Sequence, residues 1–190
     1  TPRQYRALVQ TWLGVDATDL ALPQVAAAPA ELDVVRWLEA AQAVAARVDP
    51  VALDLPCPLA EAGCGPRALA QLAQTGFRRG PTAAEAAWLG ELWAAGPPDP
   101  VRNLRRAVAA LLVSPQVLYR LSPAPDGAPA PLPRAALAAR LAWGYLGEPP
   151  DPAWADQALA RADDAAALAA ALLDDPRFAA RLDAFVTGWL

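Results

Sequence analysis

The stretch TAAEAAWLGELWAAGPPDPVRNLRRAVAALLV (residues 82–113) contains the start and end signals of two consecutive helices. Thr82 and Glu85 have the spacing of a capping box, in which each of the two side chains accepts a hydrogen bond from a backbone N–H group at the helix N-terminus. Gly96-Pro97-Pro98 ends this helix, and Asp99-Pro100 starts the next, because an acidic N-cap followed by proline is a typical helix start. The stretch therefore predicts two helices, at about residues 82–93 and 99–113.

Helix signals recur along the rest of the chain. Apolar residues follow the helical period twice before residue 50, in the stripes Tyr5, Leu8, Val9, Trp12 and Leu13, and Val34, Val35, Leu38, Ala41, Val44 and Val48. Further helices are predicted at about residues 66–77, 116–121, 134–146, 152–161, 164–173 and 176–190. No segment alternates β-branched or aromatic residues over the length of a strand. The sequence therefore predicts an all-α fold, a multi-helix bundle of about eight to nine helices.

A proline- and alanine-rich segment, SPAPDGAPAPLP (122–133), divides the predicted helices into two groups. Such a composition is typical of a linker or loop. Residues 1–121 then form an N-terminal helical region with the opening helix, the cysteine loop and the capped helices. Residues 134–190 form a C-terminal helical region, which we expect to pack with residues 111–121. The pattern is compatible with two helical lobes and equally with an ordered loop between packed helices.

Histidine and methionine are both absent from the 190-residue chain. Without histidine the chain cannot form a Ser-His-Asp triad, a Cys-His nucleophile, a His-ligated zinc site or a CxxCH haem attachment. Without methionine it also lacks a ligand of Met-ligated haem and blue-copper sites. We therefore predict that this chain binds no metal and no cofactor. Whether the chain alone is an enzyme stays open, and a non-catalytic role is the favoured reading.

The charge and hydropathy of the chain narrow the class of partner. A formal net charge of -4 argues against nucleic acid, which binds to a concentrated basic surface. The sixteen basic residues are all arginine, a bias that indicates a high-GC bacterial genome rather than phosphate recognition. No apolar run of about 18 residues is free of charge and proline, so no membrane span is predicted. Because helix signals continue up to both ends, we expect the chain to be part of a longer protein.

Two cysteines, Cys57 and Cys64, lie in the segment PCPLAEAGCG (56–65). Their spacing is not the CxxC of zinc sites or thioredoxin-like chemistry. Two cysteines that bracket a short loop with proline and glycine suit a local disulfide, which would indicate an exported protein. The alternative is a pair of buried free thiols in a cytosolic protein.

Four parts of the chain together carry a resemblance to a known family. They are TPRQYRALVQTWLGVD (1–16), the cysteine-containing segment that ends in GFRRGPTAAEAAWL (57–89), LLVSPQVLYRL with ALAARLAWGYLGEPPD (111–151), and LLDDPRFAARLDAFVTGWL (172–190). In this order they resemble helical domains of unknown function in large secreted proteins of planctomycetes and myxobacteria, which are often associated with c-type cytochrome modules. The resemblance implies an exported protein that acts together with further domains.

Two functions are consistent with these observations. The first is a non-catalytic helical scaffold or interaction domain of a larger protein in the periplasm, the cell envelope or the extracellular space. Its partners would be other domains of the parent protein or a separate protein. The alternative is an accessory part of an extracellular redox or polysaccharide-processing enzyme. The reactive centre of that enzyme, such as a c-type haem, would lie outside this chain.

Five arginines are candidates for an anion-binding site, because the guanidinium group recognises carboxylates and phosphates with two parallel hydrogen bonds. They are Arg78, Arg79, Arg102, Arg105 and Arg106. The alternative is a solvated or ion-paired helix face. We interpret Tyr119 and Arg120 as the end of a helix. Asp175 and Arg177 are interpreted as a helix cap and its charged partner.

Trp93 and Trp154 lie near predicted helix ends and are the candidates for stacking against a ligand, with a carbohydrate as the candidate class. Three nearby carboxylates, Glu148, Asp151 and Asp156, could pair for glycosidase-like chemistry, although Asp151-Pro152 is more simply a helix cap. In the C-terminal region the helical spacing predicts one shared core, formed by Val117, Leu118, Leu141, Phe178, Leu182, Phe185 and Trp189.

Overall fold

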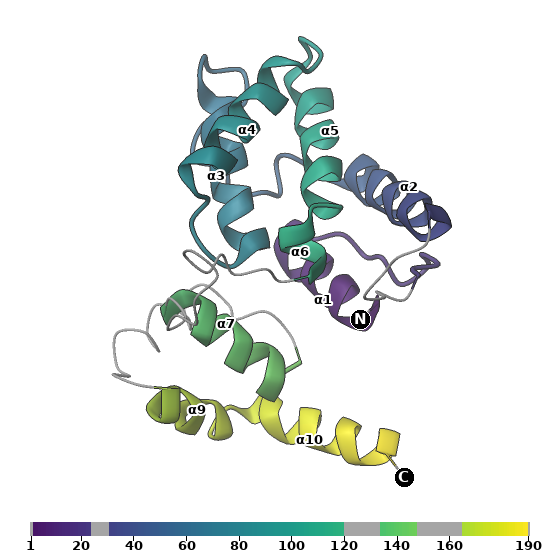
Figure 1. Ribbon diagram of the computed structural model, residues 1–190, viewed down its shortest axis with the longest axis vertical. Coiled ribbons are helices and arrows are strands. Elements are labelled where there is room, and N and C mark those ends of the chain that lie inside the picture. The colour runs from purple at the N-terminus through teal and green to yellow at the C-terminus, as the bar shows by residue number, and fades with distance from the viewer. Residues whose placement is uncertain (1, 24–30, 120–133, 148–164, 190) are drawn as a thin grey trace. The chain divides into compact units, whose positions relative to one another are not determined.

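The computed structural model describes residues 2–23, 31–119, 134–147 and 165–189, and within these ranges every regular element is a helix (Figure 1). The predicted all-α fold is therefore confirmed for the described residues. Their helices are α1 (Pro2–Leu13), α2 (Glu31–Arg47), α3 (Cys64–Phe77), α4 (Ala83–Ala94), α5 (Pro100–Leu112), α6 (Pro115–Tyr119), α7 (Arg134–Tyr145), α9 (Ala165–Leu173) and α10 (Pro176–Trp189). The helix predicted at 152–161 and the predicted linker at 122–133 lie outside the described residues.

The chain divides into two compact units, Thr1–Leu121 and Ser122–Leu190. We call them the N-terminal unit, with α1 to α6, and the C-terminal unit, with α7, α9 and α10. The expected packing of residues 111–121 against the C-terminal region involves both units and stays a prediction.

Local capping determines where α4 and α5 begin. Thr82 Oγ1 accepts a hydrogen bond from the Glu85 N–H at 3.3 Å, and Glu85 Oε2 accepts one from the Thr82 N–H at 2.8 Å. Asp99 Oδ1 accepts from the N–H groups of Val101 and Arg102, both at 2.9 Å. These bonds satisfy N–H groups that have no partner within the helix. Both predicted helix starts are thus confirmed.

Helix α5 lies at the centre of the N-terminal unit, with α2 on one side and α3 and α4 on the other (Figure 1). Both α5 and α3 contribute fully buried side chains to the core. Among them are Leu104, Val108, Leu111 and Leu112 of α5 and Leu69 of α3. On α2, the side facing the core carries Trp37, which meets the ring of Tyr5 from α1 edge-on at 4.7 Å between centroids. This packing holds α1, α2 and α5 together around one core.

The C-terminal unit has a smaller core, formed by Ala142, Leu146 and Leu172 with Phe178 packed against it. The ring centroids of Tyr145 in α7 and Phe178 in α10 are 5.8 Å apart. At the start of α10, Asp175 Oδ1 accepts from the Arg177 N–H at 2.9 Å, and the Arg177 guanidinium pairs with Asp175 at 2.6 Å. The interpretation of this pair as a helix cap with its partner is confirmed.

The predicted single buried stripe on α10 is wrong for two of its members. Leu182 and Phe185 are 48% and 55% exposed, whereas Phe178 contacts the core. The reason is geometric: α10 meets α7 and α9 near its first turns, and its later turns extend past both helices (Figure 1). The side chain of Trp189 lies outside the described residues.

Candidate binding surfaces

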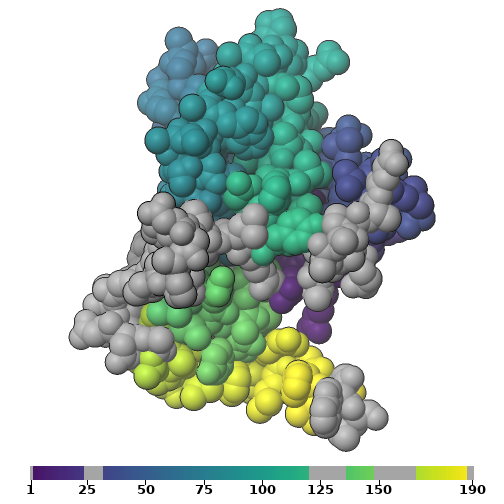
Figure 2. Space-filling view, viewed as in Figure 1, coloured from purple at the N-terminus to yellow at the C-terminus, as the bar shows by residue number. Residues whose placement is uncertain are grey.

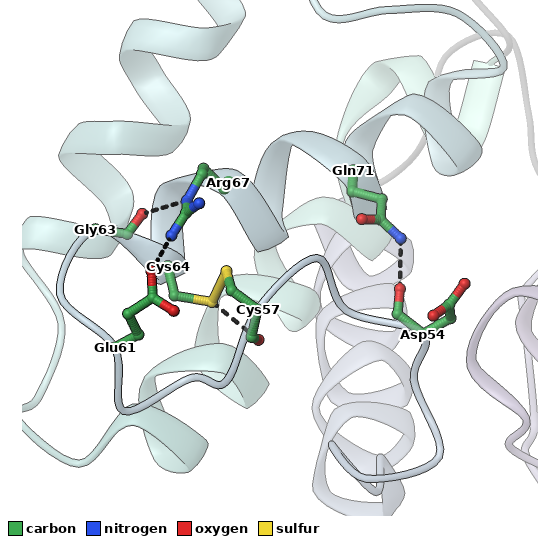
Figure 3. The surroundings of a disulfide bond; sticks show 7 residues. All are labelled: Asp54, Cys57, Glu61, Gly63, Cys64, Arg67 and Gln71. Carbon is green, nitrogen blue, oxygen red and sulfur yellow. Dashed lines mark hydrogen bonds and ion pairs between the residues drawn. A yellow bond between two sulfur atoms is a disulfide. The ribbon is translucent and has the colours of Figure 1, made fainter.

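A disulfide joins Cys57 and Cys64, as predicted, and closes a loop that leads directly into α3 (Figure 3). Cys64 is the first residue of α3 and is completely buried. Two further contacts tie this segment to the helix. Glu61 pairs with Arg67 at 2.6 Å, and the Gln71 side-chain amide donates to the backbone carbonyl of Asp54. The loop is therefore anchored to α3 on both sides of Cys57.

The turn between α4 and α5 is held by side chains of α5. The amide of Asn103, which is 97% buried, donates from Nδ2 to the Trp93 carbonyl at 2.9 Å. Arg106 donates to the neighbouring carbonyl of Leu92. The Trp93 carbonyl also accepts from the Gly96 N–H at 3.0 Å, so the two side chains add hydrogen bonds at the C-terminus of α4, where carbonyl groups lack the usual helical partners. Gly96 is required here, because a Cβ atom at this position would lie 1.7 Å from Asn103 Oδ1.

An open cavity of about 490 Å³ lies between the disulfide loop and the α4–α5 turn. Trp93 lines it from α4, the loop contributes Leu59 and Glu61, and Pro97 and Pro98 line it from the turn. The Trp93 ring lies directly on the backbone of Gly65, where a Cβ atom would come within 1.9 Å of the indole. The structure therefore places the first of the two predicted stacking tryptophans, Trp93, at a cavity. The second, Trp154, lies outside the described residues, as do Glu148, Asp151 and Asp156.

The candidate arginines contact different partners in the fold. Arg79 forms two parallel hydrogen bonds with Glu85, both 2.7 Å long, and this pair is largely buried. Gln116 of α6 donates to the same carboxylate at 3.2 Å. The hydrogen bonds from Arg79 lower the pKa of Glu85 from 4.5 to about 2, against the opposing effect of burial. This cluster joins the end of α3 to the starts of α4 and α6.

The remaining candidate arginines belong to other contacts. Arg105 donates from Nε and Nη2 to the Val48 carbonyl at 3.2 and 3.0 Å, just after the end of α2. Arg106 caps α4, and the Arg102 side chain is exposed. Arg78 ends α3 in the left-handed conformation, with φ of 61°, and its N–H donates to Thr75. The structure thus distributes the five arginines over several helix junctions, and anion binding at them stays a prediction.

Exposed aliphatic side chains gather on the first half of α2. Leu32, Val34, Val35 and Leu38 are 43–57% exposed, and we call them the α2 apolar face. Figure 2 shows atoms of α2, in dark blue, at the surface of the N-terminal unit. Ala41, Val44 and Val48, from the same sequence stripe, are fully buried. The sequence pattern carries no signal that separates these two groups, because consecutive apolar residues of a helix can both be buried, as Leu111 and Leu112 of α5 are.

A second group of exposed apolar side chains lies on α10, with Leu182, Phe185 and Val186. Tyr119, at the end of α6, is 39% exposed, and Arg120 lies outside the described residues.

In the described ranges, no three or more carboxylate or cysteine side chains are placed to hold a metal ion. None of the helices there has the length and apolar character that crossing a membrane requires.

No protein-family model matches the chain, and neither the curated proteins nor the solved structures give a significant match.

Proposed function

We propose that this chain is a non-catalytic helical interaction module of a larger exported protein, and that it binds a protein partner through the α2 apolar face. The observation that carries the proposal is the exposure of this face. Its four aliphatic side chains lie next to each other on a helix whose other side is firmly packed through Trp37, Ala41 and Val44. Contiguous apolar patches on a folded surface are typical of interaction sites, whereas single exposed aliphatic residues are common everywhere.

The surroundings of the α2 apolar face resemble the rim of a protein interface. Arg36 and Glu39, both exposed, lie between its aliphatic residues and offer one charge of each sign. Interfaces typically combine an apolar centre with a polar rim of this kind. A complementary partner would present its own apolar helix or groove flanked by charged side chains.

The electrostatics of the described carboxylates support a non-catalytic role. Where the pKa of such a group changes, at Asp16, Asp19, Glu85 and Asp175, it is lowered by hydrogen bonds to a backbone N–H group or an arginine. A general acid at neutral pH needs the opposite, a carboxyl group with a raised pKa. These four groups are therefore suited to ion pairs and helix caps.

The disulfide supports the exported location, because disulfides persist in oxidising compartments and are rare in the cytosol. The resemblance of the chain to helical domains of large secreted bacterial proteins agrees with this location and with the role of a module in a longer chain.

Site-specific photo-crosslinking in the organism that produces the protein tests the proposal. A photoreactive amino acid at Val35 should give one discrete crosslinked protein, since this side chain lies within the interface. The same group at Val51, which is 92% exposed on a loop, is the matched control and should give none. Equal products at both positions, or no product at Val35, would contradict the proposal.

A further inference from the structure

We infer that the cavity beside Trp93 binds a neutral sugar residue of a glycan. This site is separate from the α2 apolar face, and the inference is independent of the proposed function. It rests on three features of the cavity: a fixed aromatic ring, walls rich in backbone amides, and a near absence of charge.

The aromatic ring is held in place from two directions. The backbone of Trp93 is fixed by the hydrogen bond from Asn103 at 2.9 Å, and its indole lies against Gly65. Both contacts involve anchored residues, since Gly65 directly follows the disulfide-bonded Cys64 in α3 and Asn103 is buried. A partly buried indole that is already held in place loses little entropy on binding. Such a ring is suited to stack on the C–H face of a pyranose, through dispersion and apolar contact.

Small residues make up much of the rest of the wall. Ala60, Ala62, Gly63, Ala94 and Gly96 line the cavity together with Gly65. Because these residues have short or no side chains, a ligand in the cavity approaches backbone N–H and C=O groups. Backbone amides and carbonyls can form hydrogen bonds with hydroxyl groups, which a purely apolar ligand does not offer. The lining therefore favours a ligand with both an apolar face and many hydroxyl groups, which is the chemistry of a sugar.

The charge of the cavity favours a neutral sugar. Among its described lining residues Glu61 is the ionisable one, and this carboxylate already pairs with Arg67 at 2.6 Å. The described lining contains no arginine or lysine that could pair with the acid group of a uronic acid or a sulfated sugar. The volume of about 490 Å³ lies within the range of roughly 300–1,000 Å³ that is usual for small-molecule sites, so one or two sugar rings fit.

Isothermal titration calorimetry on the full chain tests this inference. The probes are cellotetraose, chitotetraose, maltotetraose and xylotetraose as neutral oligosaccharides, tetragalacturonate as an anionic one, and choline as a small cation. At least one neutral oligosaccharide should bind in the millimolar range or tighter, and tetragalacturonate and choline should bind more weakly. Failure of all four neutral probes, or a preference for tetragalacturonate or choline, would overturn the inference.

Two variants and one matched control locate the binding site. Trp93→Ala should weaken binding roughly tenfold or more. Trp88→Ala, on the same helix at an exposed position that does not line the cavity, should leave binding unchanged. Because Trp93 also supports Gly65, Ala94→Gln provides a second test, as it fills the cavity from an exposed helix position and should also abolish binding. Binding that survives Ala94→Gln in a folded variant, or that falls equally in Trp88→Ala, would place the ligand elsewhere.

Discussion

At the scale of single residues, this chain uses its charged and amide side chains to join helix ends. Arg79 and Glu85 connect the end of α3 with the start of α4, and Asn103 holds the end of α4 against α5. These contacts are buried, so they stabilise the fold more than exposed ion pairs do. The two partners in each contact are several residues apart, so the spacing of residues in the sequence does not by itself predict these contacts.

The Arg79–Glu85 pair predicts a specific loss of stability in acid. The pKa of Glu85 is lowered from 4.5 to about 2 in the folded state, chiefly by Arg79. The stabilisation is therefore complete above about pH 5 and is lost progressively as the pH falls toward 2. Glu85→Gln should reduce the free energy of unfolding at pH 7 by roughly 3 kcal/mol, with a smaller effect near pH 2. Urea unfolding of both proteins between pH 2 and 7 measures this difference, and parallel pH profiles would contradict it.

Two glycines near the end of α4 should respond in opposite ways to alanine. At Gly96 a Cβ atom would lie 1.7 Å from Asn103 Oδ1, so Gly96→Ala should displace the buried amide and destabilise the protein by about 1–3 kcal/mol. At Gly90, inside α4, a Cβ atom would meet nothing within 4 Å. Gly90→Ala should therefore stabilise the protein by about 0.5–1 kcal/mol. Thermal unfolding of the two variants checks the contrast, and equal effects would argue against the tight approach of Asn103.

At the scale of elements, helix starts and the disulfide could be predicted because their signals are local. Thr82 with Glu85 and Asp99 with Pro100 carry their capping partners within three residues. The exposure of Leu182 and Phe185 on α10 could not be predicted from the sequence. It depends on how far α7 and α9 extend beside α10. The sequence placed Trp93 near a helix end but did not predict the cavity beside it, because the residues that line this cavity are about 30 positions apart in the chain.

The disulfide should contribute measurably to the stability of the N-terminal unit. It closes a loop of eight residues, for which the reduced entropy of the unfolded chain corresponds to about 2.5 kcal/mol. The double variant Cys57→Ala/Cys64→Ala should lose about this amount in urea unfolding. If the protein is exported, as we propose, a maleimide reagent applied to the cells that produce it should modify neither cysteine before reduction. Rapid modification without a reductant would argue against an oxidising compartment.

At the scale of the whole molecule, the sequence predicted the fold class and the presence of apolar stripes, but not which stripes are covered. On α2 and directly after it, Ala41, Val44 and Val48 are buried while Val34 and Leu38 are exposed, although all five follow the same helical pattern. The difference arises from tertiary contacts, since the core-facing side of α2 packs on α1 and α5. The exposed side of α2, with its apolar face, is the surface from which we infer the function of the protein.

The partner identified by crosslinking allows the most direct test of the interaction role, which is its affinity for Val35→Asp compared with the matched variant Val51→Asp. Both residues are exposed valines, so neither change should alter the free energy of unfolding by more than about 0.5 kcal/mol. Val35→Asp should weaken the partner's affinity at least roughly tenfold, because it places a carboxylate in an apolar interface. Val51→Asp should bind as tightly as the unchanged protein. Equal affinity for both variants, with both folded, would contradict the assignment of α2 as the binding surface.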